Sequence, residues 1–132
     1  MKRSWFRRVV VVVLALLPVC LAAGAFAGGP GIDTAGLQRL LQDAPEAVFL
    51  LDVRTPREFS GGRIPGSVLI PMDQVPGRLG EIPRDRKVVV VCASGARSGA
   101  VTNYLNDNGF PDAINYTGGV YDWERRRLRL ER

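Results

Sequence analysis

Histidine is absent from all 132 residues of the chain. Its absence excludes a catalytic pair in which an imidazole deprotonates a cysteine, and it excludes any metal site built on imidazole ligands. Cysteine is almost absent, with Cys20 and Cys92 as the two occurrences. Any thiol chemistry in this chain must therefore be activated by backbone dipoles and fixed charges, because no imidazole can act as the general base.

The N-terminal segment lacks acidic residues and carries most of the surplus positive charge. Four basic residues precede an unbroken apolar run over residues 9–27: Lys2, Arg3, Arg7 and Arg8. The run ends in Ala25-Phe26-Ala27, an A-x-A pattern that suits signal peptidase. We therefore predict a signal peptide over residues 1–27 and export, to the periplasm, of a single domain over residues 28–132. An uncleaved membrane anchor facing the periplasm is the alternative, since the run is just long enough to span a bilayer.

The remaining chain is nearly neutral and contains one cysteine. Without the four N-terminal cations, 14 of the 18 basic residues remain against 13 acidic ones, so we expect no nucleic-acid partner. A membrane would be contacted only through an uncleaved N-terminus. Cys20 would leave with the signal peptide, which makes an internal disulfide impossible. The lone Cys92 is then either an inert core residue or a reactive thiol.

Short apolar runs alternate with helical patterns along the body of the chain. Helix signals cover residues 34–43, 55–61, 97–108 and a segment from about residue 120, and strand signals cover residues 47–53, 67–71, 87–92 and 113–116. This alternation predicts an α/β fold with a mostly parallel sheet flanked by helices. Residues 28–31 are predicted to form a flexible junction, residues 73–79 a short helix or turn, and residues 124–132 a solvated helix face. Tyr121 and Trp123 are predicted to be core or lid residues.

Cys92 ends the most apolar strand pattern, and a helix pattern begins a few residues later. In open α/β sheets, functional sites form beyond the carboxyl ends of the strands. Small residues fill the four positions between Cys92 and Arg97, so the backbone can curl until several N–H groups point into one concavity. These amides, the helix dipole and the Arg97 cation are expected to lower the pKa of the thiol. We therefore predict that Cys92 is a nucleophile in an exposed loop.

The segment from Cys92 to Arg97 resembles the active-site loop of the rhodanese family, the thiosulfate and related sulfurtransferases. The resemblance covers residues 32–123 and includes two further motifs. Its first motif comprises residues 51–54 (Leu-Asp-Val-Arg), Glu58-Phe59, residues 62–67 (Gly-Arg-Ile-Pro-Gly-Ser) and Ile70-Pro71. Its last motif comprises Gly118-Gly119-Val120 with Trp123. The chain departs from the family at Arg63, where histidine is common, and at residues 67–69 (Ser-Val-Leu), where Ala-x-Asn is common.

This resemblance implies a five-stranded parallel sheet flanked by helices and a persulfide carried on Cys92. The four-residue gap before Arg97 is similar to that of the sulfurtransferases, whereas related phosphatases have five residues and a wider loop. The implied reaction passes sulfane sulfur from a donor such as thiosulfate to a thiol or cyanide acceptor, with neither a cofactor nor a metal. Cys92 is implied to be catalytic, and the residues implied to bind the substrate complete the loop: Ala93, Ser94, Gly95, Ala96, Arg97 and Ser98.

The roles of several site residues remain open at this stage. Arg97 either contacts the substrate or holds the loop closed. Ser94 and Ser98 either donate hydrogen bonds to the sulfur or cap the following helix. Three charged residues form either a structural network that braces the loop, which we favour, or an acid–base set: Asp52, Arg54 and Glu58.

The function also has two alternatives outside fast sulfur transfer. The domain could act as a sulfur carrier or docking module for an exported partner protein without turning over. A small oxyanion phosphatase or reductase is the least favoured alternative. Incubation with thiosulfate separates these functions: a sulfurtransferase gains sulfur that cyanide removes, a carrier keeps its sulfur, and a phosphatase gains none and hydrolyses an aryl phosphate.

Overall fold

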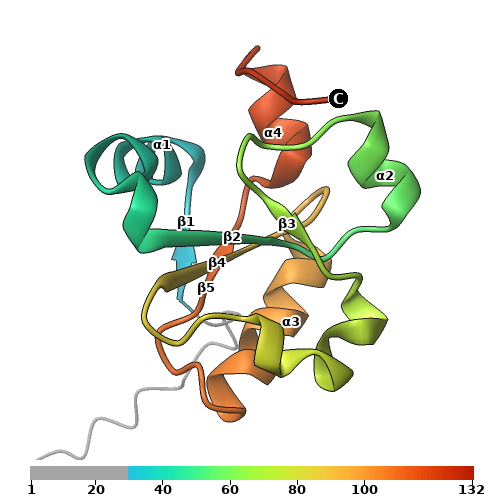
Figure 1. The fold of residues 1–132 in the computed structure, drawn as a ribbon. Helices are drawn as coiled ribbons and strands as arrows, with labels where there is room; N and C mark the ends of the chain where they lie inside the picture. Colours follow the sequence, from blue (N-terminus) through green and yellow to red (C-terminus); the bar gives the residue numbers. More distant parts are fainter. Residues whose placement is uncertain (1–29) are drawn as a thin grey trace, which may run out of the picture.

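The computed structural model describes residues 30–132, and the predicted signal peptide or anchor lies outside the described residues. Strands and helices alternate along this part of the chain (Figure 1). The strands are β1 (Gly31–Ile32), β2 (Val48–Asp52), β3 (Val68–Leu69), β4 (Lys87–Val91) and β5 (Ile114–Tyr116). The helices are α1 (Thr34–Asp43), α2 (Pro56–Gly61), α3 (Ala96–Asp107) and α4 (Gly119–Arg125), with short 3₁₀ turns at Pro45–Ala47, Met72–Gly77 and Leu79–Glu81. No helix within residues 30–132 has both the length and the apolar character needed to cross a membrane.

All five strands run parallel, in the order β1-β5-β4-β2-β3, which confirms the predicted α/β fold. The central strands β2 and β4 pair along their whole length, from Val48 beside Lys87 to Asp52 beside Val91. Because the strands are parallel, their carboxyl ends meet at one edge of the sheet. The chain leaves β4 at that edge, directly before Cys92, where parallel sheets place their functional sites.

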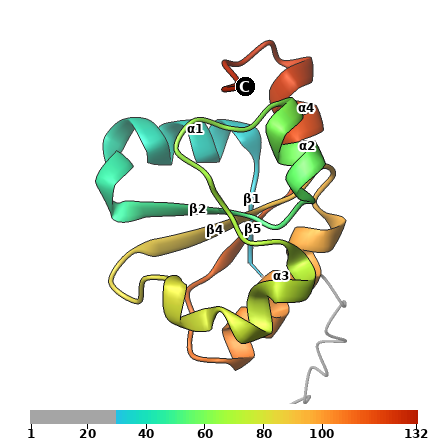
Figure 2. The same ribbon diagram turned by 45° about the vertical axis from the view of Figure 1, so that its right-hand side comes forward.

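Helices cover both faces of the sheet, with α1 and α4 on one side and α3 on the other (Figures 1 and 2). Side chains alternate along β4: Val88, Val90 and Cys92 belong to the core under α3, whereas Val89 and Val91 belong to the core under α1 and α4. Burial on both faces explains why this strand has a continuous apolar sequence. The same alternation directs Cys92 toward α3.

Side-chain caps fix the starts of two helices. The Asp33 carboxylate accepts a hydrogen bond of 2.7 Å from the Gly36 N–H at the start of α1. At α2, Thr55 Oγ1 accepts from the Glu58 N–H at 3.2 Å, and Glu58 Oε2 accepts from the Thr55 N–H at 2.9 Å. This capping box fixes the Glu58 carboxylate in the first turn of α2.

The structure corrects the prediction of a flexible junction before α1. Gly31 and Ile32 form β1 and pair with β5, from Gly31 beside Asn115 to Ile32 beside Tyr116. A strand of two residues is too short to produce an alternating pattern in the sequence, so periodicity could not reveal it. β1 completes the five-stranded sheet that the family resemblance implied.

The prediction of a solvated helix over residues 124–132 is wrong. Helix α4 ends at Arg125, and Arg127 has a φ of 57°, which turns the chain back toward the body of the domain. Leu128 and Leu130 then pack against the core under α1 and α4. The apolar side chains between the arginines explain the difference, because their burial outweighs continuation of the helix.

Candidate active site

Cys92 lies between the end of β4 and the start of α3, where the sequence predicts it. Its exposed fraction is 0%, and Ala93 beside it is 5% exposed, whereas Ser94 and Ala96 are exposed. The loop is therefore exposed at Ser94 and Ala96, as predicted, whereas the Cys92 sulfur that it carries is buried. The loop of small residues curls around the thiol and encloses it.

Two hydrogen-bond donors from the loop and α3 point at the sulfur. The Gly95 N–H donates to Cys92 Sγ at 3.1 Å, and Ser98 Oγ donates to the same atom at 3.2 Å. Gly95 has a φ of 92°, which lets the chain turn at the N-terminus of α3 so that its amide faces back toward the sulfur. Ser98 is fully buried, so its hydroxyl is held in place against the thiol.

The hydrogen bonds around Cys92 favour the thiolate. Burial raises the pKa of Cys92, but hydrogen bonds from the Ser98 hydroxyl and from the backbone N–H groups of Ser98, Ser94 and Gly95 outweigh burial and lower the pKa below its ordinary value. The predicted direction is confirmed. Ser98 acts through its side chain and its backbone N–H, whereas Ser94 acts through its backbone alone.

We expect Ser98→Ala to raise the pKa of Cys92. A hydrogen bond to a charged group contributes about 1.5–3 kcal/mol, so the thiolate fraction below the titration midpoint should fall about tenfold or more. Ultraviolet absorbance of the thiolate, followed as a function of pH, measures the midpoint without requiring a reagent to reach the buried sulfur. Ser94→Ala is the matched control, because it leaves the backbone amide in place, and its midpoint should match that of the unmodified protein. An unchanged midpoint in Ser98→Ala would contradict the assigned hydrogen bond.

The start of α4 holds the other side of the loop. The Val120 N–H donates to the Cys92 carbonyl at 2.9 Å, and the Tyr121 N–H donates to the Ala93 carbonyl at 3.0 Å. Gly119 has a φ of 64°, and a Cβ at this position would lie 2.2 Å from the Ala93 carbonyl oxygen. The Gly118-Gly119 motif therefore has a physical reason here, since only glycine permits this close approach to the Cys92 loop.

Sequence reasoning missed one residue that holds the loop, Asn115 in β5. Asn115 Nδ2 donates to the Gly95 carbonyl at 3.1 Å. This bond holds Gly95 at its carbonyl oxygen while the Gly95 N–H donates to the Cys92 sulfur. Asn115 is 9% exposed and its Oδ1 is buried without a hydrogen-bond partner. The only available signal in the sequence was a polar side chain in the middle of an apolar strand.

Arg97 forms an ion pair with Glu58. Arg97 donates two hydrogen bonds to the Glu58 carboxylate, at 2.9 Å and 2.7 Å. This pairing, led by the Arg97 hydrogen bond, lowers the pKa of Glu58 to about 2, so the carboxylate is ionised at neutral pH. Of the two roles left open for Arg97, the structure shows the one that braces the loop, because the ion pair joins the start of α3 to α2.

A second, buried ion pair joins Arg54 and Asp52 at the end of β2, beside α2. Arg54 contacts Asp52 through Nε at 3.0 Å and Nη2 at 2.7 Å, and both residues are almost fully buried. Arg54 also donates to the carbonyl of Glu58 at 3.3 Å and to that of Gly62 at 2.9 Å. Asp52, Arg54 and Glu58 thus form the predicted structural network, with each carboxylate bound to an arginine.

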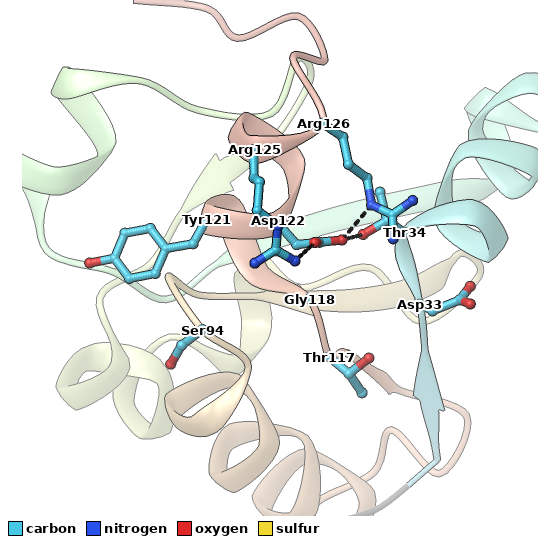
Figure 3. Close-up of a pocket in the computed structure, with 9 residues that line it drawn as sticks. All are labelled: Asp33, Thr34, Ser94, Thr117, Gly118, Tyr121, Asp122, Arg125 and Arg126. Carbon is cyan, nitrogen blue, oxygen red and sulfur yellow. Dashed lines mark hydrogen bonds and ion pairs between the residues drawn. The ribbon is translucent and has the colours of Figure 1, made fainter.

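A cavity of about 440 Å³ lies beside the loop, lined by Ser94 and by residues of α1 and α4 (Figure 3). Asp122 lies in its wall between Thr34, which donates to it, and two arginines at the end of α4, Arg125 and Arg126. Tyr121 is 63% exposed at the cavity, which leaves the lid role open, whereas Trp123 is a core residue. Across residues 30–132, no group of three potential metal-ligating side chains comes together.

Comparisons with known proteins give one consistent family. A model of the rhodanese-like domain matches residues 33–126. A sulfurtransferase of Allochromatium vinosum is 43% identical over 99 residues, which cover 75% of this chain and 92% of that protein. A putative sulfurtransferase of Bacillus subtilis, YtwF, is 38% identical over 93 residues, which cover 70% of this chain and 88% of that protein.

Solved structures agree with the sequence relatives. A rhodanese-like domain protein of Staphylococcus aureus is 39% identical, with a TM-score of 0.66 over 71% of this chain and 90% of that one. A rhodanese-related protein of Thermoplasma volcanium is 29% identical, with a TM-score of 0.70 over 77% of this chain and 97% of that one. With the parallel sheet and the motifs around Cys92, these similarities show that the chain belongs to the rhodanese-like domain family.

Proposed function

We propose that this domain is a sulfurtransferase that carries sulfane sulfur as a persulfide on Cys92. The observation that carries the proposal is the pair of donors on Cys92 Sγ, the Gly95 N–H at 3.1 Å and the Ser98 hydroxyl at 3.2 Å. Donors fixed in a water-poor site stabilise negative charge on sulfur without reorganising during the reaction. Two relatives aligned over most of the chain are named sulfurtransferase or putative sulfurtransferase, which supports sulfur transfer as the reaction class.

The reaction proceeds in two displacements at sulfur. The Cys92 thiolate attacks the outer sulfur of a donor such as thiosulfate, the donor's S–S bond breaks, and sulfite leaves with the electron pair. The persulfide formed on Cys92 carries one negative charge on its outer sulfur, and the loop amides stabilise that charge. An acceptor thiol or cyanide then takes the outer sulfur and restores the thiolate. Neither step needs a general base, which agrees with a chain that lacks histidine.

The rest of the loop has a supporting role in this proposal. Ala93, Ser94, Gly95 and Ala96 supply the backbone that surrounds the sulfur, and Ser98 supplies the hydroxyl. Arg97 holds the loop against α2 through Glu58. We further propose that the mature domain acts after export and removal of residues 1–27, where a thiol, cyanide or an exported protein accepts the sulfur.

Intact-mass spectrometry of protein incubated with thiosulfate tests the function. We expect a gain of one sulfur mass, located on Cys92 by peptide mapping, and its loss on addition of cyanide with release of thiocyanate. A stable gain that cyanide does not remove would contradict turnover and favour a carrier module. No gain, combined with hydrolysis of an aryl phosphate, would overturn sulfur transfer. The same intact mass, measured on protein recovered after export, shows whether the chain starts at Gly28.

A further inference from the structure

The cations beside the Cys92 loop are already paired with carboxylates. Three cavities border the loop, one lined by Ser94, one by Ala93 and one by Arg97. Together they are lined by five aspartate and glutamate side chains and by four arginines: Arg54, Arg97, Arg125 and Arg126. The surroundings of the loop therefore carry no surplus of positive charge.

Each of the four arginines donates to a carboxylate. Arg97 uses two nitrogens on Glu58, and Arg54 uses two nitrogens on the buried Asp52. Arg125 and Arg126 both donate to Asp122, as Figure 3 shows. A planar guanidinium that binds a carboxylate has part of its donor set occupied and its positive charge compensated, so it attracts an anionic sulfur donor less strongly.

Arg97 is the cation whose pairing bears most directly on the reaction. It ends the loop that holds Cys92, and Arg97 and Glu58 are 37% and 33% exposed, so solvent and solutes reach the pair. A donor that approaches the Cys92 thiolate meets like charge from the sulfur, and Glu58 compensates the Arg97 charge that would otherwise offset this repulsion. The repulsion grows with each negative charge on the donor.

We propose that this site prefers a sulfane donor with a single negative charge, such as an organic thiosulfonate, over the thiosulfate dianion, and that Glu58 sets the preference by occupying the Arg97 guanidinium. The inference rests on the proposed sulfur transfer and specifies its donor class. Thiosulfate remains a donor, but a slower one, because its second charge must either stay uncompensated or pull Arg97 away from Glu58.

The two donors differ in charge but undergo the same step. With a thiosulfonate, the Cys92 thiolate attacks the outer sulfur, the S–S bond breaks, and the sulfinate leaves with the electron pair. With thiosulfate, the same bond breaks and sulfite leaves with one more negative charge. Both reactions leave the same persulfide on Cys92 and consume no oxidant, reductant or proton.

The test compares kcat/KM for methanethiosulfonate and for thiosulfate, with cyanide as acceptor, in the unmodified protein and in Glu58→Gln. Glutamine keeps an oxygen that can accept from the Thr55 N–H, so the cap of α2 is retained. Release of Arg97 should raise kcat/KM for thiosulfate about tenfold, the effect of one unit charge at close range in a partly solvated site. The value for methanethiosulfonate should rise by about threefold or less. The ratio of kcat/KM for methanethiosulfonate to kcat/KM for thiosulfate is compared between the two proteins. Because the donors are the same in both proteins, their intrinsic reactivities cancel in this comparison.

Glu124→Gln is the matched control. It removes a carboxylate from a cavity that Glu58 also lines, but it does not release Arg97. Its donor ratio should stay that of the unmodified protein. An equal change in both variants would overturn the role assigned to the Glu58–Arg97 pair, because general charge removal would then explain the preference.

The remaining outcomes separate the donor class from the function itself. If neither donor places sulfur on Cys92, the proposed function fails. If both donors do and Glu58→Gln leaves their ratio unchanged, only the donor inference fails. If Glu58→Gln does not fold, salt dependence decides the question: raising ionic strength from about 0.02 M to about 0.5 M should weaken the preference of the unmodified protein for methanethiosulfonate. A preference that is constant or stronger at high salt would overturn the inference.

Discussion

Cys92→Ser protein is expected to fold normally and to lose sulfur transfer by at least about a thousandfold. A serine hydroxyl stays protonated near neutral pH, and the chain has no histidine to deprotonate it. An oxygen nucleophile also cannot form the persulfide that the second displacement requires. The fold should survive, because serine is similar in size and its Oγ can accept the hydrogen bonds that Gly95 and Ser98 now donate to sulfur.

Single-turnover assays and intact mass measure this loss directly. Persulfide formation from thiosulfate and thiocyanate release should both disappear in Cys92→Ser, while circular dichroism and the melting temperature stay close to those of the unmodified protein. Cys20→Ser in the full chain is the control and should retain sulfur transfer. Persulfide on Cys92→Ser protein at more than about a hundredth of the normal rate would place the nucleophile elsewhere.

Local sequence predicted the position of Cys92 but not the enclosure of its sulfur. The valine run of β4, buried on both faces, and the small residues after it were sufficient to predict a strand, a tight loop and a helix start. The enclosure depends on α4, whose first amides bind the carbonyls of Cys92 and Ala93. That contact comes from a distant segment and requires the positive φ of Gly119, which composition does not reveal.

The ion-pair partners of the charged residues could not be predicted from local sequence either. From the sequence we favoured a structural network of Asp52, Arg54 and Glu58, because sulfur transfer needs no strong general base. The sequence did not indicate that Glu58 binds Arg97, because the two are 39 residues apart and meet only when α2 and α3 lie at the same edge of the sheet. Asn115, 20 residues from Gly95, was missed for the same reason. Strand and helix patterns follow from local physics, whereas these pairs follow from the parallel order of the strands.

Gly95→Ala is expected to have the second-largest effect, through the backbone alone. A Cβ on Gly95 would lie 2.4 Å from the Thr117 carbonyl oxygen and 3.0 Å from its carbonyl carbon. Both atoms belong to the backbone that leads from β5 to α4, so no side chain can swing aside. The φ of 92° adds strain for any residue with a Cβ, about 1–3 kcal/mol.

The loop must therefore move in Gly95→Ala, and its hydrogen bonds move with it. Displacement withdraws the Gly95 N–H from Cys92 Sγ and the Gly95 carbonyl from Asn115. Loss of one fixed donor from a site that stabilises developing negative charge typically costs about 100- to 1,000-fold in rate. We expect kcat/KM for sulfur transfer to fall by about 100-fold, together with a rise in the pKa of Cys92 and a lower melting temperature.

Gly66→Ala separates backbone strain from displacement of the loop. Gly66 has a φ of 81°, close to that of Gly95, but no atom lies within 4 Å of the position that its Cβ would occupy. In Gly66→Ala, the free energy of unfolding, measured by urea titration, should fall by an amount similar to the φ strain expected at Gly95. Its kcat/KM and the titration midpoint of its thiolate should stay unchanged. If Gly95→Ala behaves like Gly66→Ala in all three measurements, the Gly95 amide does not stabilise sulfur. If only Gly95→Ala loses activity and raises the midpoint, the donors around Cys92 are what make this thiol reactive.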